Sequence, residues 1–202
     1  MTYTFWKPIL DRLIAGAALV LLSPVLGAIA VAIILFDGRP VLFTQQRAGQ
    51  NGEPFCIYKF RTLRLGPKDP ERPGAHCTRT GGFLRRWALD ELPQLWNIVR
   101  GDMSFIGPRP TLLDQVRRYG AFERKRLHVK PGLTGWAQIH GRNALSWPER
   151  IRLDVWYVEH QSLWVDAKIL LHTPRVLWRG TGVYGLADRN LEYRLSRKDS
   201  SI

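Results

Sequence analysis

Two adjacent carboxylates, Asp90 and Glu91, are the side chains of this sequence best suited to covalent chemistry. They lie in the run LDELPQLWNIVRGDMSFIGPRP, residues 89–110. Apolar residues recur in this run at the i, i+3, i+4 and i+7 spacing of one helix face, which predicts a helix that begins at Asp90. An Asp at a helix N-terminus faces unpaired backbone N–H groups, so we expect its ionised, nucleophilic form to be favoured. In an arbitrary protein, an Asp at this position is most often only a helix cap.

Basic residues surround the two carboxylates in the sequence. Arg85 precedes Asp90 by five residues, and Arg109 follows it between Pro108 and Pro110. The prolines fix the backbone on both sides of Arg109, which limits the entropy lost when its guanidinium binds a phosphate through two hydrogen bonds. A carboxylate among cations predicts phosphoryl transfer, in which Asp attacks phosphorus and a divalent cation screens the charge.

The chain of 202 residues is strongly basic, with 30 Lys and Arg against 17 Asp and Glu and a formal net charge of +13. The excess is concentrated in residues 59–150, which hold 18 Lys and Arg and 8 Asp and Glu. Such a charge requires an anionic partner, which could be nucleic acid, anionic lipid or a phosphorylated substrate. An apolar share of 45% excludes a disordered chain, and Cys56 and Cys77 lack the number and spacing of a disulfide framework or a zinc site.

An uncharged segment, residues 13–36, precedes the basic region and is long enough for a helix that crosses a bilayer. Pro24 removes the hydrogen bond to the carbonyl of Val20, which predicts a kink or break, and we expect the Ser23 hydroxyl to serve the freed backbone groups. Basic residues flank the segment on both sides. Because a helix that enters and leaves by one face keeps both flanks in the cytoplasm, we favour a re-entrant anchor, residues 1–38, over a kinked single span.

The pattern of residues 39–202 predicts a catalytic domain with an α+β fold, which is mainly helical and contains a small β-hairpin. The hairpin is expected over residues 41–63, around a Gly-Gln-Asn-Gly turn. Residues 64–82 predict a mobile loop, long enough to act as a lid. Residues 147–178 predict one or two amphipathic helices whose tryptophans could lie in the protein core or in the headgroup plane of a membrane.

Four runs of the chain carry a resemblance to a known family. They are the apolar segment broken at Ser23-Pro24, the run Lys59-Phe60-Arg61-Thr62, residues 89–110, and KPGLTGWAQIHGRN at 130–143. In these motifs the chain resembles the bacterial sugar transferases, and among them the small monotopic phosphoglycosyl transferases, over nearly its whole length. It departs from that pattern at Leu63, where Met is more common, and at Trp87-Ala88, where small hydroxylated residues are more common.

The resemblance implies the transfer of a sugar-1-phosphate from a UDP-sugar to polyprenyl phosphate, with release of UMP and a requirement for Mg²⁺. It implies that Asp90 is the nucleophile that forms a covalent phosphosugar intermediate, that Glu91 is its partner, and that both lie at the metal. It also implies that the reaction initiates glycoconjugate synthesis and takes place at the cytoplasmic face of the bacterial inner membrane. Both termini of the protein would then be cytoplasmic. The residues expected around the substrate phosphates are Lys59, Arg61, Arg85 and Arg109, supported by Pro108, Pro110, Thr134 and Gln138.

Two other functions fit part of the pattern. A noncatalytic membrane scaffold of a glycan assembly complex would keep the fold, although the presence of Asp90, Glu91 and Arg109 argues against it. A membrane-tethered nucleic-acid-binding protein would use the charge of +13, but the sequence contains no RNP, zinc-finger or helix-turn-helix signature. We therefore expect lipid and UDP-sugar, and no nucleic acid, as partners, whereas the identity of the sugar and the oligomeric state stay open.

Overall fold

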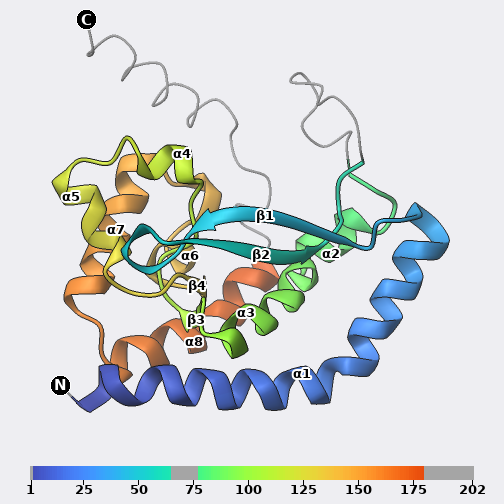
Figure 1. Ribbon diagram of the computed structural model, residues 1–202, viewed down its shortest axis with the longest axis horizontal. Coiled ribbons are helices and arrows are strands. Elements are labelled where there is room, and N and C mark those ends of the chain that lie inside the picture. Colours follow the sequence, from blue (N-terminus) through green and yellow to red (C-terminus); the bar gives the residue numbers. More distant parts are fainter. Residues whose placement is uncertain (1, 65–76, 180–202) are drawn as a thin grey trace, which may run out of the picture.

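The computed structural model describes residues 2–64 and 77–179 of the chain. This part is mainly helical and contains the predicted hairpin, together with a small parallel strand pair that sequence analysis misses. In Figure 1 the long N-terminal helix follows one side of the body that the other elements form. Most of the predicted loop 64–82 lies outside the described residues.

Most of the helices are short, and the strands form two separate two-stranded sheets. The α-helices are α1 (Thr2–Asp37), α2 (Gly81–Arg86), α3 (Leu95–Arg100), α4 (Leu113–Val116), α5 (Ala121–Arg124), α6 (Trp136–Ile139), α7 (Trp147–Glu159) and α8 (Leu163–Arg179). The 3₁₀ helices are η1 (Gln50–Gly52), η2 (Leu89–Gln94), η3 (Lys125–Leu127) and η4 (Arg142–Ala144). The strands are β1 (Leu42–Ala48), β2 (Pro54–Phe60), β3 (Ser104–Ile106) and β4 (Gly132–Thr134).

The hairpin of β1 and β2 is antiparallel, and its register runs from Leu42 opposite Phe60 to Ala48 opposite Pro54. Strands β3 and β4 pair in parallel, and they join the run at residues 89–110 to the run at 130–143. Glycines allow these two backbones to approach closely. A Cβ at Gly132 would lie 2.1 Å from the backbone nitrogen of Gly107, a separation that real atoms do not reach, so only glycine fits there.

Helix α1 is continuous through Pro24 and changes direction part way along its length (Figure 1). The predicted interruption is therefore a bend inside one helix and not a gap between two helices. The Ser23 hydroxyl donates a hydrogen bond of 2.8 Å to the carbonyl of Val20. This is the carbonyl that Pro24 leaves without its usual donor, so the predicted role of Ser23 is confirmed.

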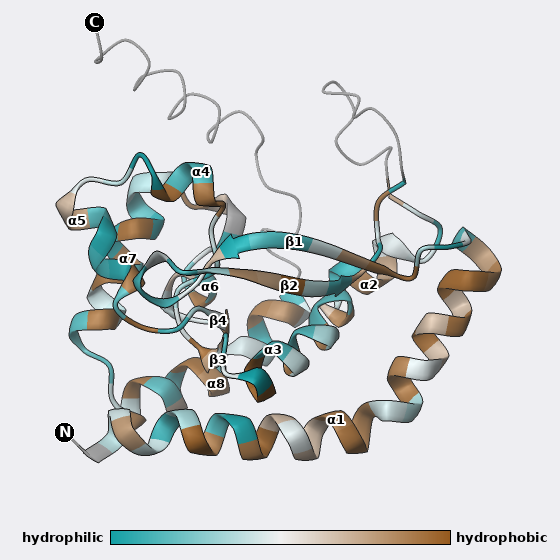
Figure 2. Cartoon of the chain, viewed as in Figure 1, coloured by the Kyte–Doolittle hydropathy of each residue, from teal (hydrophilic) through white to brown (hydrophobic). Residues whose placement is uncertain are grey.

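One face of α1 packs on the body and the other is exposed. Before the bend, Ala15 packs in a cluster with Ile98 and Met103; after it, Ile33 packs with Phe60. The exposed face is apolar and includes Leu13, Val20, Leu21, Leu35 and Phe36. Figure 2 shows this apolar character along most of α1. Since water would not favour so large an apolar surface, this face indicates contact with a membrane.

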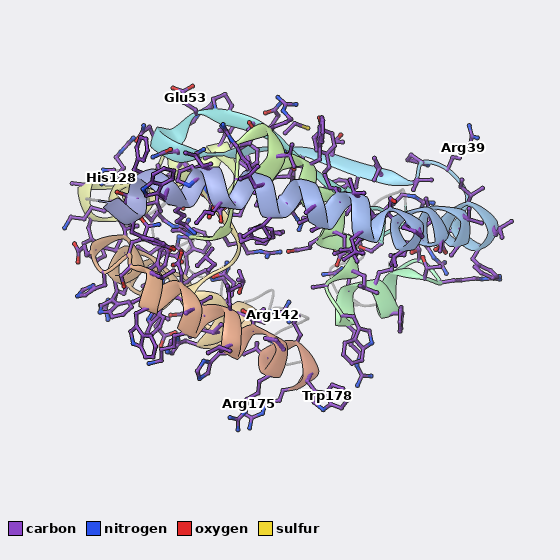
Figure 3. All side chains as sticks on the ribbon, turned by 90° about the horizontal axis from the view of Figure 1, so that it is seen from below. Arg39, Glu53, His128, Arg142, Arg175 and Trp178 are labelled. Atoms are coloured by element: carbon purple, nitrogen blue, oxygen red, sulfur yellow. The ribbon has the colours of Figure 1, made fainter. Side chains whose placement is uncertain are left out.

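Helix α8 lies on the same side of the molecule as α1, and both helices face the reader in Figure 3. Its tryptophans Trp164 and Trp178 are 78% and 75% exposed, whereas Trp147 at the start of α7 is buried. The tryptophans thus divide between the two locations that the sequence left open. Two of them lie in the surface that α1 and α8 present, where Trp favours a membrane interface.

Polar contacts hold both ends of α1 on the same body. Near its N-terminus, the Nζ of Lys7 lies 2.7 Å from a carboxylate oxygen of Asp166 in α8. At its C-terminus, Arg61 is 6% exposed and donates hydrogen bonds of 2.6 Å to the carbonyls of Asp37, Gly38 and Pro40. Asp37 is the last residue of α1, where a carbonyl has no partner within the helix, and Gly38 and Pro40 follow it. Arg61 therefore acts as a cap that joins the end of α1 to the end of β2.

This contact generates a prediction for Arg61, which the family resemblance places at the substrate phosphates. The substitution Arg61→Gln should lower the free energy of unfolding by ~1.5–3 kcal/mol, because it removes the charged hydrogen bonds that a buried guanidinium makes to three carbonyls. Thermal unfolding in detergent measures this loss, and Arg64→Gln at an exposed position serves as the matched control. An unchanged unfolding midpoint combined with weaker UDP-sugar binding would contradict the capping role.

Candidate active site

The two carboxylates lie in η2 and not at the start of an α-helix. Residues Leu89–Gln94 form a 3₁₀ helix, and α3 begins only at Leu95. The Glu91 N–H donates to the carbonyl of Ala88 at 3.1 Å, three residues back, which is the bond of a 3₁₀ turn. Pro93, inside η2, has no N–H with which to close an α-helical turn there. The prediction that Asp90 caps an α-helix is therefore wrong. The predicted apolar stripe is also only partly correct, since Leu95 is buried but Trp96 is 50% exposed.

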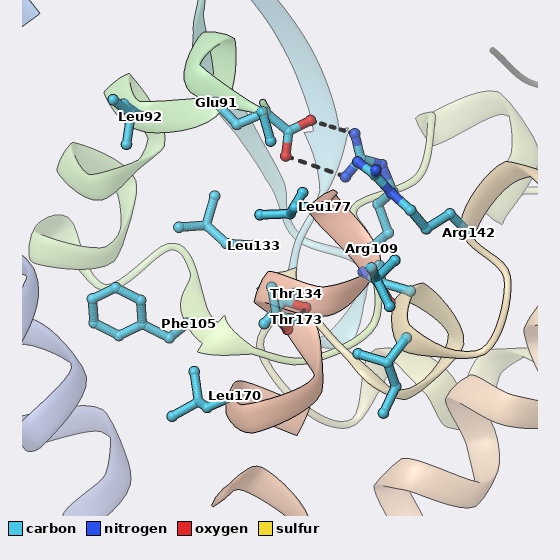
Figure 4. A pocket seen from close by; sticks show the side chains of 14 residues that line it. Glu91, Leu92, Phe105, Arg109, Leu133, Thr134, Arg142, Leu170, Thr173 and Leu177 are labelled. Atoms are coloured by element: carbon cyan, nitrogen blue, oxygen red, sulfur yellow. Dashed lines mark hydrogen bonds and ion pairs between the residues drawn. The ribbon is translucent and has the colours of Figure 1, made fainter. Parts of the chain in front are cut away.

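Glu91 is held by two cations from different parts of the chain. The Nζ of Lys59 in β2 lies 2.6 Å from its Oε1. Arg109 donates from Nη1 to Oε2 at 3.2 Å and from Nη2 to Oε1, so its guanidinium pairs with the carboxylate through both nitrogens (Figure 4). The two positive charges hold the pKa of the Glu91 carboxyl well below its usual range, against the opposing effect of burial. Glu91 is thus a fixed negative charge.

Asp90 lies in a different environment, although it is the neighbouring residue. Its side chain is nearly buried, with 9% of the residue exposed, and it has no hydrogen bond to any other described residue. Burial, together with the charge of Glu91, raises the pKa of Asp90 to about 6, even though Lys59, Arg109 and Arg85 act in the opposite direction. The expectation that its surroundings favour the ionised form is therefore wrong in sign, because burial outweighs the local cations. Asp90 is still ionised in most molecules at pH 7.

The Pro108-Arg109-Pro110 turn is held from behind by a buried network. The Nη2 of Arg126 donates to the carbonyl of Arg109 at 3.0 Å and to a carboxylate oxygen of Asp154 in α7 at 2.5 Å. Both Arg126 and Asp154 are almost completely buried. Since prolines flank Arg109 and Arg126 holds its carbonyl, the backbone that carries this guanidinium has little freedom.

Most of the predicted site residues converge, and one does not. Asp90, Glu91, Lys59 and Arg109 form one cluster, and Arg85 at the end of α2 contributes to its electrostatics. Thr134 and Gln138 line a cavity beside this cluster. The structure does not bring Arg61 into the cluster, since its hydrogen bonds go to the end of α1.

Three arginines near the cluster escape the analysis of the residues themselves: Arg47, Arg142 and Arg150. Burial and the charge of Arg109 lower the pKa of Arg47 to about 10, and burial also lowers the pKa values of Arg142 and Arg150. The Nη1 of Arg142 is buried without a hydrogen-bond partner among the described residues. Arg142 belongs to the run at 130–143, so its place in a family motif is the one signal by which it could be found. Together with Arg85 and Arg109, these three arginines form a site for an anion near one carboxylate pair.

A cavity of about 250 Å³ opens beside Glu91 (Figure 4). Its polar end consists of Glu91, Arg109, Gln138 and Arg142. Its remaining walls are mainly apolar and come from η2, β3, β4, α6 and α8: Ala88, Leu92, Phe105, Leu133, Thr134, Ile139, Leu170, Thr173, Val176 and Leu177. A second cavity of about 30 Å³ shares the polar end and adds Arg150 and Ala137.

The two carboxylates fit a magnesium ion only if substrate phosphates and water complete its coordination shell. Among the described residues, no group of three or more His, Cys, Asp or Glu side chains could enclose a metal. Glu91 is already neutralised by Lys59 and Arg109, whereas the oxygens of Asp90 form no ion pair within residues 2–64 and 77–179. Magnesium in phosphoryl-transfer enzymes commonly takes one or two carboxylates and completes its shell with substrate phosphates and water. Asp90 fits this arrangement, and Glu91 would fit it only by giving up its ion pairs.

Comparison with known proteins places this site in a family. The chain matches the family described as Bacterial sugar transferase over residues 2–180. It is 42% identical to the protein named uncharacterized sugar transferase EpsL of Bacillus subtilis (strain 168), over 85% of this chain and 87% of EpsL.

Longer relatives match over the same region. A UDP-N-acetylgalactosamine-undecaprenyl-phosphate N-acetylgalactosaminephosphotransferase of Aeromonas hydrophila is 40% identical over 89% of this chain. A UDP-glucose:undecaprenyl-phosphate glucose-1-phosphate transferase of Escherichia coli (strain K12) is 39% identical over 81% of it. The chain spans 45% and 38% of the lengths of these two proteins. The match over residues 2–180, together with a relative of similar length, shows that this chain belongs to the bacterial sugar transferase family.

Proposed function

We propose that this protein transfers a sugar-1-phosphate from a UDP-sugar to undecaprenyl phosphate, releases UMP, and so initiates the synthesis of a glycoconjugate. The observation that carries the proposal is the contrast between two neighbours. Asp90 is nearly buried and has no hydrogen bond to another described residue, whereas Glu91 is held by two cations. The longer relatives from Aeromonas hydrophila and Escherichia coli support it, because their names describe this type of transfer with two different sugars.

The reaction proceeds in two balanced steps. An oxygen of the Asp90 carboxylate attacks the phosphorus that bears the sugar, an Asp–phosphorus bond forms, and the bond to UMP breaks with its electron pair leaving on UMP. An oxygen of undecaprenyl phosphate then attacks the same phosphorus, and the Asp90 carboxylate leaves. The raised pKa makes Asp90 a stronger nucleophile than an ordinary carboxylate while leaving most of it ionised at pH 7.

The neighbouring residues stabilise the negative charge of the reacting phosphates and form no covalent bond in the reaction. Glu91 orients Arg109 through two hydrogen bonds, so that the guanidinium is already in place when a diphosphate arrives. Arg142 has a buried nitrogen, Nη1, that finds no partner in the part of the chain that the structure describes and that can bind a phosphate oxygen. A bound Mg²⁺, for which Asp90 and the substrate phosphates are the fitting ligands, supplies further neutralisation of the diphosphate.

We infer that residues 1–38 form a re-entrant anchor that holds residues 39–202 at the cytoplasmic face of the inner membrane, with both termini in the cytoplasm. Polar contacts attach the body to α1 near both of its ends, through Lys7 and through Arg61. A helix that crossed the bilayer would have to separate these two attachments by the thickness of the membrane. A soluble nucleotide-sugar and a membrane-bound acceptor can meet only at the interface, which this arrangement provides.

A noncatalytic scaffold is the competing function, and Asp90→Asn separates the two. The amide lacks the anionic oxygen that attacks phosphorus, so UMP release should fall by about three orders of magnitude or more, as when other enzymes lose a nucleophile. Unchanged circular dichroism and membrane fractionation would show that the variant is folded. UMP release is measured with a panel of UDP-sugars and undecaprenyl phosphate, and near-normal release by the variant would contradict the assignment.

The pH dependence provides a second prediction. Asp90 must be ionised to attack, so kcat/KM for the UDP-sugar should be constant above pH 7 and fall as the pH drops through about 6. The charge of Glu91 contributes to the raised pKa, so the residual activity of Glu91→Gln should have its inflection at a lower pH. A UDP-sugar does not titrate in this range, which leaves the enzyme as the source of the inflection. An inflection that stays in place in Glu91→Gln would contradict the coupling.

The orientation of the anchor is tested at its bend. The double substitution of Ser23→Ala and Pro24→Leu restores the missing backbone hydrogen bond and permits one straight helix of spanning length. We expect part of the variant to place its N-terminus outside and to lose activity. An introduced N-terminal cysteine and an impermeant thiol reagent, applied to intact cells, report the location. Labelling of a protein that retains Ser23 and Pro24 would contradict the re-entrant anchor.

A further inference from the structure

We propose that the cavity of about 250 Å³ beside Glu91 binds the first isoprene units of the lipid acceptor, and that the acceptor's phosphate lies at its polar end. This inference rests on the proposed function and specifies the half of the reaction that the cavity serves. It also assigns a substrate-binding role to the inner face of α8, which sequence analysis treats only as an interfacial or core helix.

The cavity has a cationic end and apolar walls, which match the phosphate and the hydrocarbon chain of a lipid phosphate. Arg109 and Arg142 lie at one end, and Leu133, Leu170 and Leu177 are among the apolar walls (Figure 4). The Nη1 of Arg142 is buried and unpaired among the described residues. An anionic group at that end would satisfy this donor, while an apolar chain would fill the remainder.

A nucleoside or a sugar fits the apolar walls poorly, because each would bury polar groups that need partners. The hydroxyls on these walls belong to Thr134 and Thr173, and both already form hydrogen bonds within the protein. Their Oγ1 atoms lie 2.8 Å apart, and the Thr173 hydroxyl also bonds the carbonyl of Ile169 at 2.8 Å. The walls therefore favour an isoprenoid chain over the polar parts of the donor.

The cavity is also continuous with the surface that faces the membrane. Leu170 lines it and is nevertheless 50% exposed, so this side chain lies at its opening. The helix that carries Leu170 also presents the exposed Trp164 and Trp178. Figure 3 shows this helix, α8, and α1 on the same side of the molecule. An acceptor could thus enter sideways from the bilayer without exposing its chain to water.

The size of the cavity limits what enters it. Pockets that enclose drug-sized ligands measure roughly 300–1,000 Å³, and this one is smaller, at about 250 Å³. It can hold only the part of a long isoprenoid next to the phosphate, so the rest of the chain stays in the lipid. We therefore expect recognition of the phosphate and its nearest units, and little dependence on the far end of the chain.

The test separates the two half-reactions of the purified full chain in detergent micelles. UDP-sugar alone gives a single-turnover burst of UMP from formation of the Asp90 adduct. Added undecaprenyl phosphate gives steady turnover that depends on acceptor binding. Leu170→Trp and Val176→Phe place extra bulk at the opening and in the wall of the cavity. Leu171→Trp is the matched control, since Leu171 is 78% exposed and does not line the cavity.

For both cavity variants we expect kcat/KM for undecaprenyl phosphate to fall about 10-fold or more, while the burst rate stays within about two-fold of that of the unchanged protein, because bulk in a filled pocket excludes its ligand. The control should match the unchanged protein in both measurements. A burst slowed as much as turnover would show that the cavity serves the donor, and unchanged acceptor kinetics would show that it serves neither; both contradict the inference. Absence of any burst from the unchanged protein would instead contradict the proposed function, and with it the inference that rests on it.

Discussion

The ion pairs of Glu91 with Arg109 and Lys59 join three regions that are far apart in the sequence. They connect strand β2, the short helix η2 and the turn between Pro108 and Pro110. A carboxylate buried without these partners would be protonated or would destabilise the fold, and the two cations would repel each other without it. The fold therefore depends on the same contacts that orient the charges of the site, and a substitution at Glu91 affects both.

Adjacent residues of one short helix acquire opposite properties from this arrangement. Two cations pair with Glu91 and lower the pKa of its carboxyl. Burial and the negative charge of Glu91 dominate at Asp90 and raise its pKa to about 6. Two carboxylates whose environments separate their pKa values commonly divide the work of an active site. Here one of them organises the positive charge, and the other retains a reactive lone pair.

Local sequence patterns predict local structure well in this chain. The hairpin over residues 41–63 and the bond from Ser23 to the carbonyl of Val20 both follow from neighbouring residues. The parallel pairing of β3 with β4 does not, because it joins segments separated by an entire helical region. The raised pKa of Asp90 also depends on tertiary burial that no spacing of residues reveals. Residue type and spacing located the two carboxylates. The expectation that Arg61 lies with the substrate differs from the structure, in which Arg61 holds the end of α1.

The attachment of both ends of α1 to the body has a consequence for the membranes in which the protein can work. A helix that crosses a bilayer must match the hydrocarbon thickness, and it tilts or deforms the lipid when it does not. In the re-entrant arrangement proposed above, a helix held near both ends by Lys7 and Arg61 contacts only one leaflet. In that arrangement the depth of the helix follows from the shape of the protein, so we expect the height of Asp90 above the acyl chains not to change with bilayer thickness. We therefore expect hydrophobic mismatch, to which helices that span a bilayer must adapt, to have little effect on this protein.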